Sequence, residues 1–194
     1  MHQLSAFANI DLYTLTAQGI GIVAMLFNIF SYQQKTQKGA IAFLLCGTTL
    51  FSVNFFMLGA TVGCFMNIIG AIRSIVYLNK KRLRADSIYW LIFFVVLYVA
   101  AYIVTLVFFK EDPKAIDYII ELLPVIGMTA ATIGFMKTDA AAVRRYGLIC
   151  SPSWLIYNIC NFAVGAIICE VLSLCSIIIG IIRFDIKKKN EMSD

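Results

Sequence analysis

Long apolar runs, separated by short polar stretches, make up most of the chain. A helix needs about 20 predominantly apolar residues to cross a membrane. The runs that approach or meet this length predict seven spans, at residues 12–32, 39–58, 62–78, 87–109, 115–136, 142–160 and 162–184. The sixth has the weakest pattern, because Arg144, Arg145, Ser151 and Pro152 interrupt its first half. The pattern therefore predicts an all-α integral membrane protein with seven transmembrane helices.

The composition points the same way. Of the 194 residues, 61% are hydrophobic and 14% are charged, whereas soluble domains are about 45–50% apolar and about 25% charged. This excludes an ordinary soluble protein, and seven spans leave too few residues for a separate soluble domain. The first ten residues contain no Lys or Arg, so we expect the first apolar run to be a retained span and not a cleaved signal peptide.

The positions of the basic residues predict the orientation of the chain. Thirteen of the 16 Lys and Arg residues follow the first, third, fifth and seventh spans, whereas Lys110 and Lys114 follow the fourth and Arg73 lies inside the third. Basic residues collect in cytoplasmic loops. We therefore expect the N-terminus outside and the C-terminus in the cytoplasm. Because topology accounts for the net charge of +5, we expect no nucleic-acid partner.

The two halves of the chain repeat one plan. Asn54 and Asn158 lie at matching depths in the second and sixth spans, and Asn67 and Glu170 at matching depths in the third and seventh. Each half reads as helix, basic loop, helix, tight turn, helix, and one extra span is needed to place both basic loops inside. The sequence therefore predicts a three-plus-one-plus-three architecture of parallel repeats. The predicted units are residues 1–79, 80–114 and 115–194.

Polar side chains inside the spans are candidates for a functional site. A polar group that faces lipid has no water to bond, so it usually faces a partner helix or a wet cavity. Trp154, Tyr157 and Asn158 are three and four residues apart and share one helical face. Asn54 and Asn67 are further candidates. For each asparagine, a place in a cavity and an interhelical hydrogen bond both stay open.

Two charged residues lie within the predicted spans. An acid deep in a span is expensive and usually functional, so Glu170 suggests proton coupling or binding of a cationic solute. The alternative is a structural acid, either protonated or paired with Arg73. Arg73 itself lies close enough to the inner boundary that we expect it to extend its guanidinium there.

Proline and glycine residues are candidate hinges for a moving helix. Pro124 with Gly127, and Gly19 with Gly21, lie in the first helix of each predicted repeat, and Pro152 lies just before Trp154. They are expected to act as gating points, although such residues are also common in membrane helices for packing reasons.

Catalytic signals are weak throughout the sequence. The one histidine is His2, there is no G-x-S-x-G motif, and Gly19-Ile-Gly21 lacks the third glycine of a nucleotide-binding loop. The six cysteines form no C-x-x-C pair and fall mostly within apolar runs, where cysteine behaves as a small hydrophobe. We expect no enzyme activity, no cofactor and no metal.

Short motifs in the third and sixth spans resemble those of a known superfamily. Asn67, with glycine three residues later and Tyr77 ten residues later, resembles the third helix of SWEET and SemiSWEET sugar transporters. Trp154 and Tyr157 resemble the W-x-x-Y-G motif of the same superfamily, with Asn158 in place of the glycine. Glu170 stands where SWEETs carry a second asparagine.

The chain as a whole, over residues 12–185, looks most like the YgjV-type bacterial inner-membrane proteins, which are related to the SWEET and PQ-loop superfamily. The segment Ser31-Tyr-Gln-Gln-Lys-Thr-Gln-Lys38 is part of this resemblance. It implies a multi-pass protein of the bacterial inner membrane. Because both predicted repeats are present in one chain, we expect a monomer to be self-sufficient, and a homodimer stays open.

The resemblance also implies a function. A SWEET-like protein passes a small polar, sugar-like solute by alternating access, with no second ion. Trp154 would stack on the solute and Asn67 would bond it. The predicted lining is Trp154, Asn67, Glu170, Asn158, Asn54 and Tyr157. Two alternatives remain: a vitamin or nucleoside-precursor carrier of the same plan, and a receptor or scaffold that does not transport.

Overall fold

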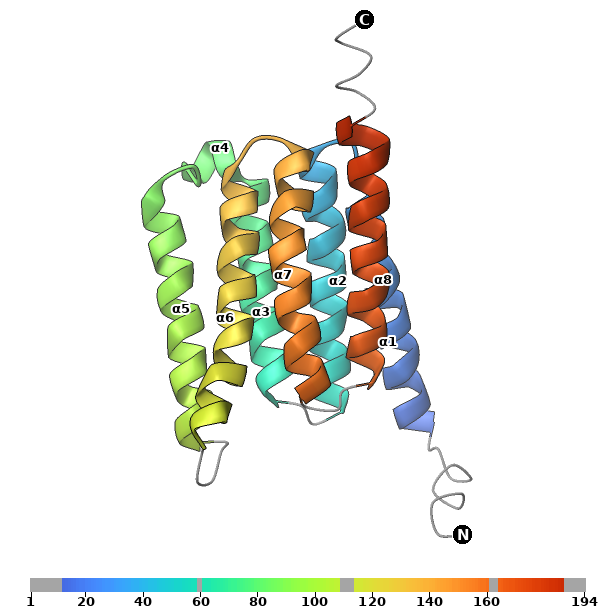
Figure 1. Ribbon diagram of the computed structural model, residues 1–194, viewed down its shortest axis with the longest axis vertical. Helices are drawn as coiled ribbons and strands as arrows, with labels where there is room; N and C mark the ends of the chain where they lie inside the picture. The colour runs from blue at the N-terminus through green and yellow to red at the C-terminus, as the bar shows by residue number, and fades with distance from the viewer. Residues whose placement is uncertain (1–11, 59–60, 109–113, 161–163, 187–194) are drawn as a thin grey trace, which may run out of the picture.

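The computed structural model describes residues 12–58, 61–108, 114–160 and 164–186, and these form one bundle of long helices that run side by side (Figure 1). The helices are α1 (Leu12–Ser31), α2 (Gln37–Met57), α3 (Thr61–Leu78), α4 (Lys80–Leu83), α5 (Ile88–Phe108), α6 (Ala115–Met136), α7 (Ala140–Cys160) and α8 (Val164–Gly180), followed by the π-helix η2 (Ile181–Ile186). The described ends of the chain, at α1 and η2, lie at opposite ends of the bundle (Figure 1).

The described ends of the predicted spans fall within two residues of the predicted ones, with α8 and η2 taken together as the last span. The predicted end of the fourth span at Phe109 and the predicted start of the seventh at Phe162 lie outside the described residues, as do the tails that contain His2 and residues 187–189. Two short elements were not expected, namely α4 and the π-helical end of the last span. In α7 the helix continues through Pro152.

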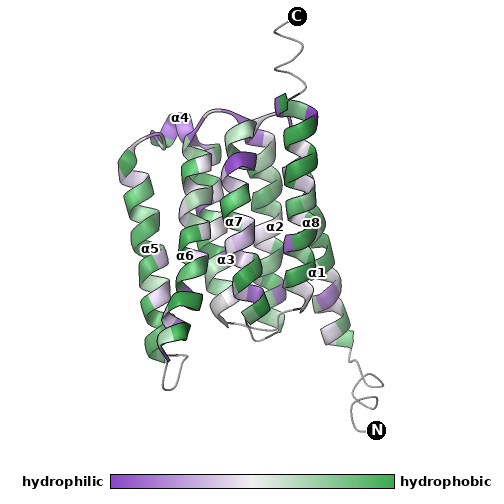
Figure 2. Ribbon diagram, viewed as in Figure 1, coloured by the Kyte–Doolittle hydropathy of each residue, from purple (hydrophilic) through white to green (hydrophobic). Residues whose placement is uncertain are grey.

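Five described segments are long and apolar enough to cross a membrane, namely α1, α2, α5, α6 and residues 165–186. The apolar part of α3 is shorter, at residues 63–78, and α7 carries too many polar residues to qualify. The protein therefore has the helices of an integral membrane protein, and the seven crossings stay a prediction. Apolar residues cover much of the bundle, while polar residues gather at the end that carries α4 (Figure 2).

Local sequence signals set several helix ends. The Thr36 hydroxyl accepts a hydrogen bond from the Gly39 N–H at 3.1 Å, which caps the start of α2. At the start of α6, the Lys114 N–H donates to the Asp117 carboxylate at 2.9 Å. Arg84 ends α4 in a left-handed conformation, with a φ of 48°.

The helices pack as two three-helix units. Helix α2 packs between α1 and α3, and α7 packs between α6 and α8. Helix α5 packs mainly on α6 and also on α3. Three pairs join the units, namely α1 with α8, α2 with α7, and α3 with α6. A cluster of buried aromatic rings, formed by Tyr77, Phe94, Tyr98 and Phe135, fixes α5 against α3 and α6.

Polar side chains also connect the two units at the end that carries the basic loops. The Gln37 amide of α2 donates to the Phe135 carbonyl at 2.9 Å, and the Lys80 ammonium of α4 donates to the Lys137 carbonyl at 2.7 Å. Both acceptors are at the C-terminal end of α6, where carbonyls lack helical partners and cations are favourable. The Gln33 amide donates to the Ser176 carbonyl of α8 at 2.7 Å.

Arg144 of α7 also contributes polar contacts at this end of the bundle. Its side chain is 3% exposed, forms an ion pair with Asp185 of η2, and donates to the Gln34 carbonyl at 3.0 Å. This single guanidinium therefore joins α7 and the end of the last span to the loop between α1 and α2.

Candidate functional site

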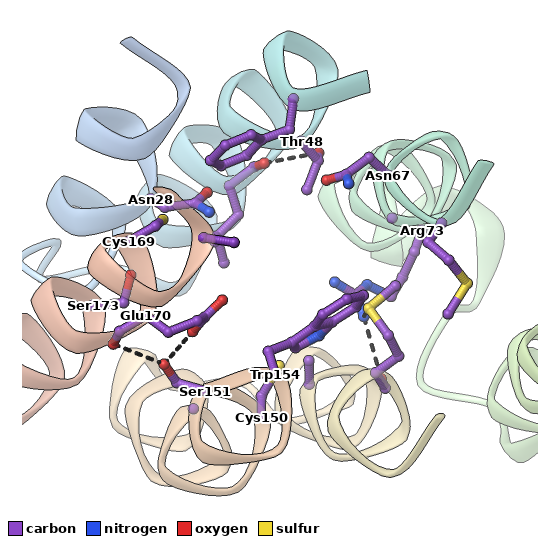
Figure 3. Close-up of a pocket in the computed structure, with 18 of the residues that line it drawn as sticks. Asn28, Thr48, Asn67, Arg73, Cys150, Ser151, Trp154, Cys169, Glu170 and Ser173 are labelled. Atoms are coloured by element: carbon purple, nitrogen blue, oxygen red, sulfur yellow. Dashed lines mark hydrogen bonds between the residues drawn. The ribbon is translucent and has the colours of Figure 1, made fainter. Parts of the chain in front are cut away.

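A cavity of about 150 Å³ lies inside the bundle, between the two three-helix units (Figure 3). Side chains from α1, α2 and α3 line one side of it, and side chains from α6, α7 and α8 line the other. No described residue of α5 contributes to the lining. The aromatic cluster explains this, because it holds α5 outside the two units.

Helical spacing explains which residues reach the cavity. The lining residues of α3 include Asn67, Gly70 and Arg73, each three residues from the last. In α7, Ser151, Trp154 and Asn158 are three and four apart. Residues at these spacings lie on one face of a helix, so each helix turns one partly polar face away from lipid and toward the cavity.

Glu170 of α8 supplies the negative group of the cavity wall. The hydroxyl of Ser151 donates to one oxygen of the Glu170 carboxylate, and to the Glu170 main-chain carbonyl at 3.3 Å. Within the described residues, the hydrogen bond to the Glu170 carboxylate goes to Oε2 and none goes to Oε1. No ion pair joins Glu170 to Arg73 in the described ranges, so the paired alternative is not supported.

Arg73 of α3 supplies the positive group, and its expected extension to the inner boundary was wrong. The residue is 5% exposed, and its Nη1 donates to the Met128 carbonyl at 3.2 Å and to the Tyr98 hydroxyl at 3.3 Å. Its guanidinium lies over the Phe135 ring, 4.7 Å from the centroid. Arg73 is therefore buried against α5 and α6 and does not extend to water at the inner boundary of the membrane.

Three predicted residues lie where a cavity site requires them. Asn67, Trp154 and Asn158 all line the cavity. The Asn67 amide donates to the Gly63 carbonyl of its own helix at 2.8 Å, so it does not hold a neighbouring helix through that group. Trp154 packs edge to face on Tyr157, with ring centroids 5.7 Å apart.

Two other predicted residues lie away from the cavity. The buried amide of Asn54 donates to the Ala17 carbonyl of α1 at 2.7 Å. Of the two alternatives for Asn54, the structure thus has the interhelical hydrogen bond. Tyr157 is not part of the lining and bonds Glu121, a buried acid of α6. The sequence did not separate these cases, because Asn54 and Asn67 differ only in the direction that their helix faces.

The candidate hinge residues occupy different environments. Gly127 lies close to α7, since an added Cβ would be 3.1 Å from the Cys150 carbonyl, and Gly21 lies close to the Asn54 amide. Gly19 faces open space. Pro124 and Pro152 stand inside their helices and remove one main-chain donor each.

Sequence reasoning missed several lining residues. Asn28 and Thr48 face the cavity from α1 and α2, and Figure 3 shows both directed into it. A lone carboxamide in the apolar run of the first span was the available signal for Asn28. Cys150 and Cys169, which are free thiols, also line the cavity.

Comparison with known proteins gives the family. Residues 15–188 match the family model Imp-YgjV, described as bacterial inner membrane protein. The chain is 26% identical over 168 residues to inner membrane protein YgjV of Escherichia coli strain K12, which covers 87% of this chain and 84% of that protein. No solved structure matches the chain. Since the family model spans most of the helical bundle, the chain belongs to the YgjV family of bacterial inner membrane proteins.

Proposed function

We propose that this protein carries a small polar solute across the inner membrane by alternating access. The observation that carries the proposal is the cavity, which is lined by charged and amide side chains from both three-helix units. Polar groups at this position are costly in a membrane protein unless they meet a partner, water or a solute. The proposal includes seven crossings, with the N-terminus outside and the C-terminus in the cytoplasm.

The contacts between the units support a repeated, SWEET-like plan. If α1, α2 and α3 correspond to α6, α7 and α8, then the pair α1 with α8 corresponds to the pair α6 with α3. The pair α2 with α7 corresponds to itself. All three contacts are therefore the ones expected of two parallel repeats around an axis along the membrane normal. Because both units belong to one chain, a monomer has a complete cavity.

The connections at the basic end support a state that is closed on that side. Gln37 joins the units there, Lys80 joins α4 to the end of α6, and Arg144 joins α7 to the first loop. Rocking of one unit against the other would break these bonds and open the cavity toward the cytoplasm.

The cavity volume limits the solute. A cavity of about 150 Å³ is known to hold one benzene molecule. This size favours a small solute over a nucleoside in the conformation seen here.

Solute flux into proteoliposomes tests the proposal. Purified protein would be reconstituted and exposed to D-glucose, D-ribose, L-alanine, L-leucine and nicotinamide riboside, with uptake followed by radiolabel. We expect saturable uptake of at least one solute, well above that of protein-free liposomes, and loss of that uptake in Trp154→Ala. The matched control is Trp90→Ala, because Trp90 packs on Phe94 of α5 and does not line the cavity.

The two alternatives give different results in the same assay. Thermal stabilisation of the detergent-purified protein by a solute that shows no flux would favour a receptor and would contradict the carrier. Uptake that is linear in solute concentration and equal in both variants would indicate a leak and not a site.

A further inference from the structure

The cavity holds two opposite charges that do not neutralise each other directly. Arg73 lies on α3 of the first unit and Glu170 on α8 of the second, and Figure 3 shows the two side chains on different sides of the open centre. We propose that the solute is a small zwitterion of the amino-acid class, whose carboxylate binds Arg73 and whose ammonium group binds Glu170. This inference rests on the proposed function, because it names the solute class of that carrier.

Arg73 has unused donors for a carboxylate. Its Nη1 makes all of its hydrogen bonds in the described part of the chain, while its Nε is buried without a partner. A buried donor that stays unpaired is costly, and such groups in native proteins require an explanation. Nε and Nη2 of a guanidinium form a planar fork that matches the two oxygens of a carboxylate. A carboxylate in the cavity would supply both the acceptor and the counter-ion that Arg73 lacks.

Glu170 has an unused acceptor for an ammonium group. One of its carboxylate oxygens is bonded by Ser151, and Oε1 is left over. An ammonium group carries three donors and a positive charge, so it matches Oε1 together with a second acceptor on the wall.

Charge balance favours a zwitterion over a solute with a single charge. A solute with only a carboxylate would leave Glu170 without a cation, and an amine would leave Arg73 without an anion. An unpaired charge in a low-dielectric site is strongly unfavourable. A zwitterion pairs both charges at once, and it connects α3 with α8, which belong to different units. Binding would thus favour closure of the cavity around the solute.

The remaining wall suits an uncharged side chain. Phe51, Met66 and Trp154 give the cavity an apolar surface of aromatic rings and a thioether. With a volume of about 150 Å³, this leaves room for an aliphatic amino acid in the size range of alanine to leucine.

Two matched sets of solutes test the assignment on purified, detergent-solubilised full-length protein. The first is L-alanine, propionate and ethylamine, and the second is L-leucine, isocaproate and isoamylamine; D-glucose is the comparison. Dissociation constants would come from thermal-shift titrations. We expect at least one amino acid to bind about tenfold more tightly than its acid and its amine, since one unpaired buried charge costs more than 1.4 kcal/mol.

Variants then separate the two charges. In Glu170→Gln, which keeps an acceptor for Ser151, the preference for the amino acid over its carboxylic acid should fall about tenfold, while binding of the carboxylic acid stays measurable. Glu121→Gln is the matched control, because Glu121 is also a buried acid of a membrane helix but does not line the cavity. Arg73→Lys should weaken binding of the amino acid and of the carboxylate alike, and its unliganded melting temperature reports whether it folds.

The outcomes distinguish this inference from the proposed function. Saturable flux of D-glucose without binding of any amino acid would overturn the zwitterion and leave the carrier intact. An amino-acid preference that is unchanged in Glu170→Gln would also overturn it. Amino-acid binding with no flux would support the zwitterion and contradict the carrier.

Discussion

Hydrogen-bond partners separate the structural asparagines of this protein from those at the cavity. Asn54 and Asn67 look alike in the sequence, yet the Asn54 amide bonds the main chain of α1. The Asn67 amide instead bonds the main chain of its own helix, and Asn67 lines the cavity. The direction of an asparagine depends on how its helix is rotated, which neighbouring helices decide. Sequence reasoning could therefore find both residues but not their roles.

Substitution of the two asparagines should affect different properties, stability for Asn54 and solute binding for Asn67. Asn54→Ala removes an interhelical hydrogen bond and should lower the free energy of unfolding by about 1 kcal/mol, with solute binding unchanged. Asn67→Ala should weaken solute binding and change stability less. Denaturation in mixed detergent micelles and solute titration on both variants measure the two quantities. Equal losses of binding in the two variants would contradict this assignment.

Gly180 and Gly19 make a second residue-scale comparison. A Cβ at Gly180 would lie 2.6 Å from the Tyr32 carbonyl and 2.8 Å from Cδ of Arg144, whereas one at Gly19 would meet nothing within 4 Å. Gly180→Ala should therefore destabilise the protein by about 1–3 kcal/mol through overpacking. Gly19→Ala should be neutral or stabilise by up to about 1 kcal/mol. Melting temperatures of the two variants in one detergent check the contrast.

At the scale of elements, apolar length predicted the helices well. Each of the seven predicted spans has described ends within two residues of its predicted ones when α8 and η2 are taken together, because an apolar run and its polar flanks determine where a membrane helix begins and ends. Helix α4 (Lys80–Leu83) escaped prediction because three basic residues and one leucine carry no periodic pattern. The π-helical turn at residues 181–186 also has no such signal, and it places Asp185 against Arg144.

The Arg144–Asp185 ion pair should matter far more than the neighbouring Arg145–Asp139 pair. Arg144 is buried, so Asp185→Asn leaves its charge without a counter-ion and should cost about 3 kcal/mol of stability. The side chains of Arg145 and Asp139 are 65% and 53% exposed, so Asp139→Asn should cost under about 1 kcal/mol. Unfolding of both variants in mixed micelles compares them, and similar losses would show that burial does not decide the strength of the pair.

At the scale of the whole molecule, the two-unit plan and the basic end could be predicted, but the cavity could not. Repeated positions and charge bias are properties of the sequence alone. The predicted lining residues all lie in α2, α3, α7 and α8, but the cavity also needs α1 and α6. Residues such as Asn28 and Met128 join it only because the units meet at α1–α8 and α3–α6.

The basic end is predicted to face the cytoplasm. In a variant without native cysteines, a cysteine at Lys38 should react with a membrane-impermeant maleimide only after cell lysis. A cysteine at Lys114, at the other end of the bundle, should react in spheroplasts. The reverse labelling pattern would show that the basic end faces the outside. The closed end of the cavity would then be the outer end.

The hydrogen bonds at the basic end should control which side of the membrane reaches the cavity. Gln37 of α2 donates to the Phe135 carbonyl of α6, across the two units. Loss of one such bond, worth about 1 kcal/mol, should shift the two-state equilibrium about fivefold toward the cytoplasm-open state. Cys150 and Cys169 report this directly, because both line the cavity.

With the other four cysteines changed to serine, Gln37→Ala should raise the rate of thiol labelling from the cytoplasmic side of inverted vesicles and lower it from the outer side. The matched control is Gln34→Ala, because the Gln34 side chain donates to the Phe30 carbonyl of its own unit, at 3.1 Å, and makes no hydrogen bond to the second unit among the described residues. Labelling rates that rise on both sides would indicate a loosened bundle. A higher rate from the cytoplasmic side together with a lower rate from the outer side, with neither change in the control, requires a protein that alternates between two states. In one state the cavity is closed at the cytoplasmic end, and in the other it is closed at the outer end.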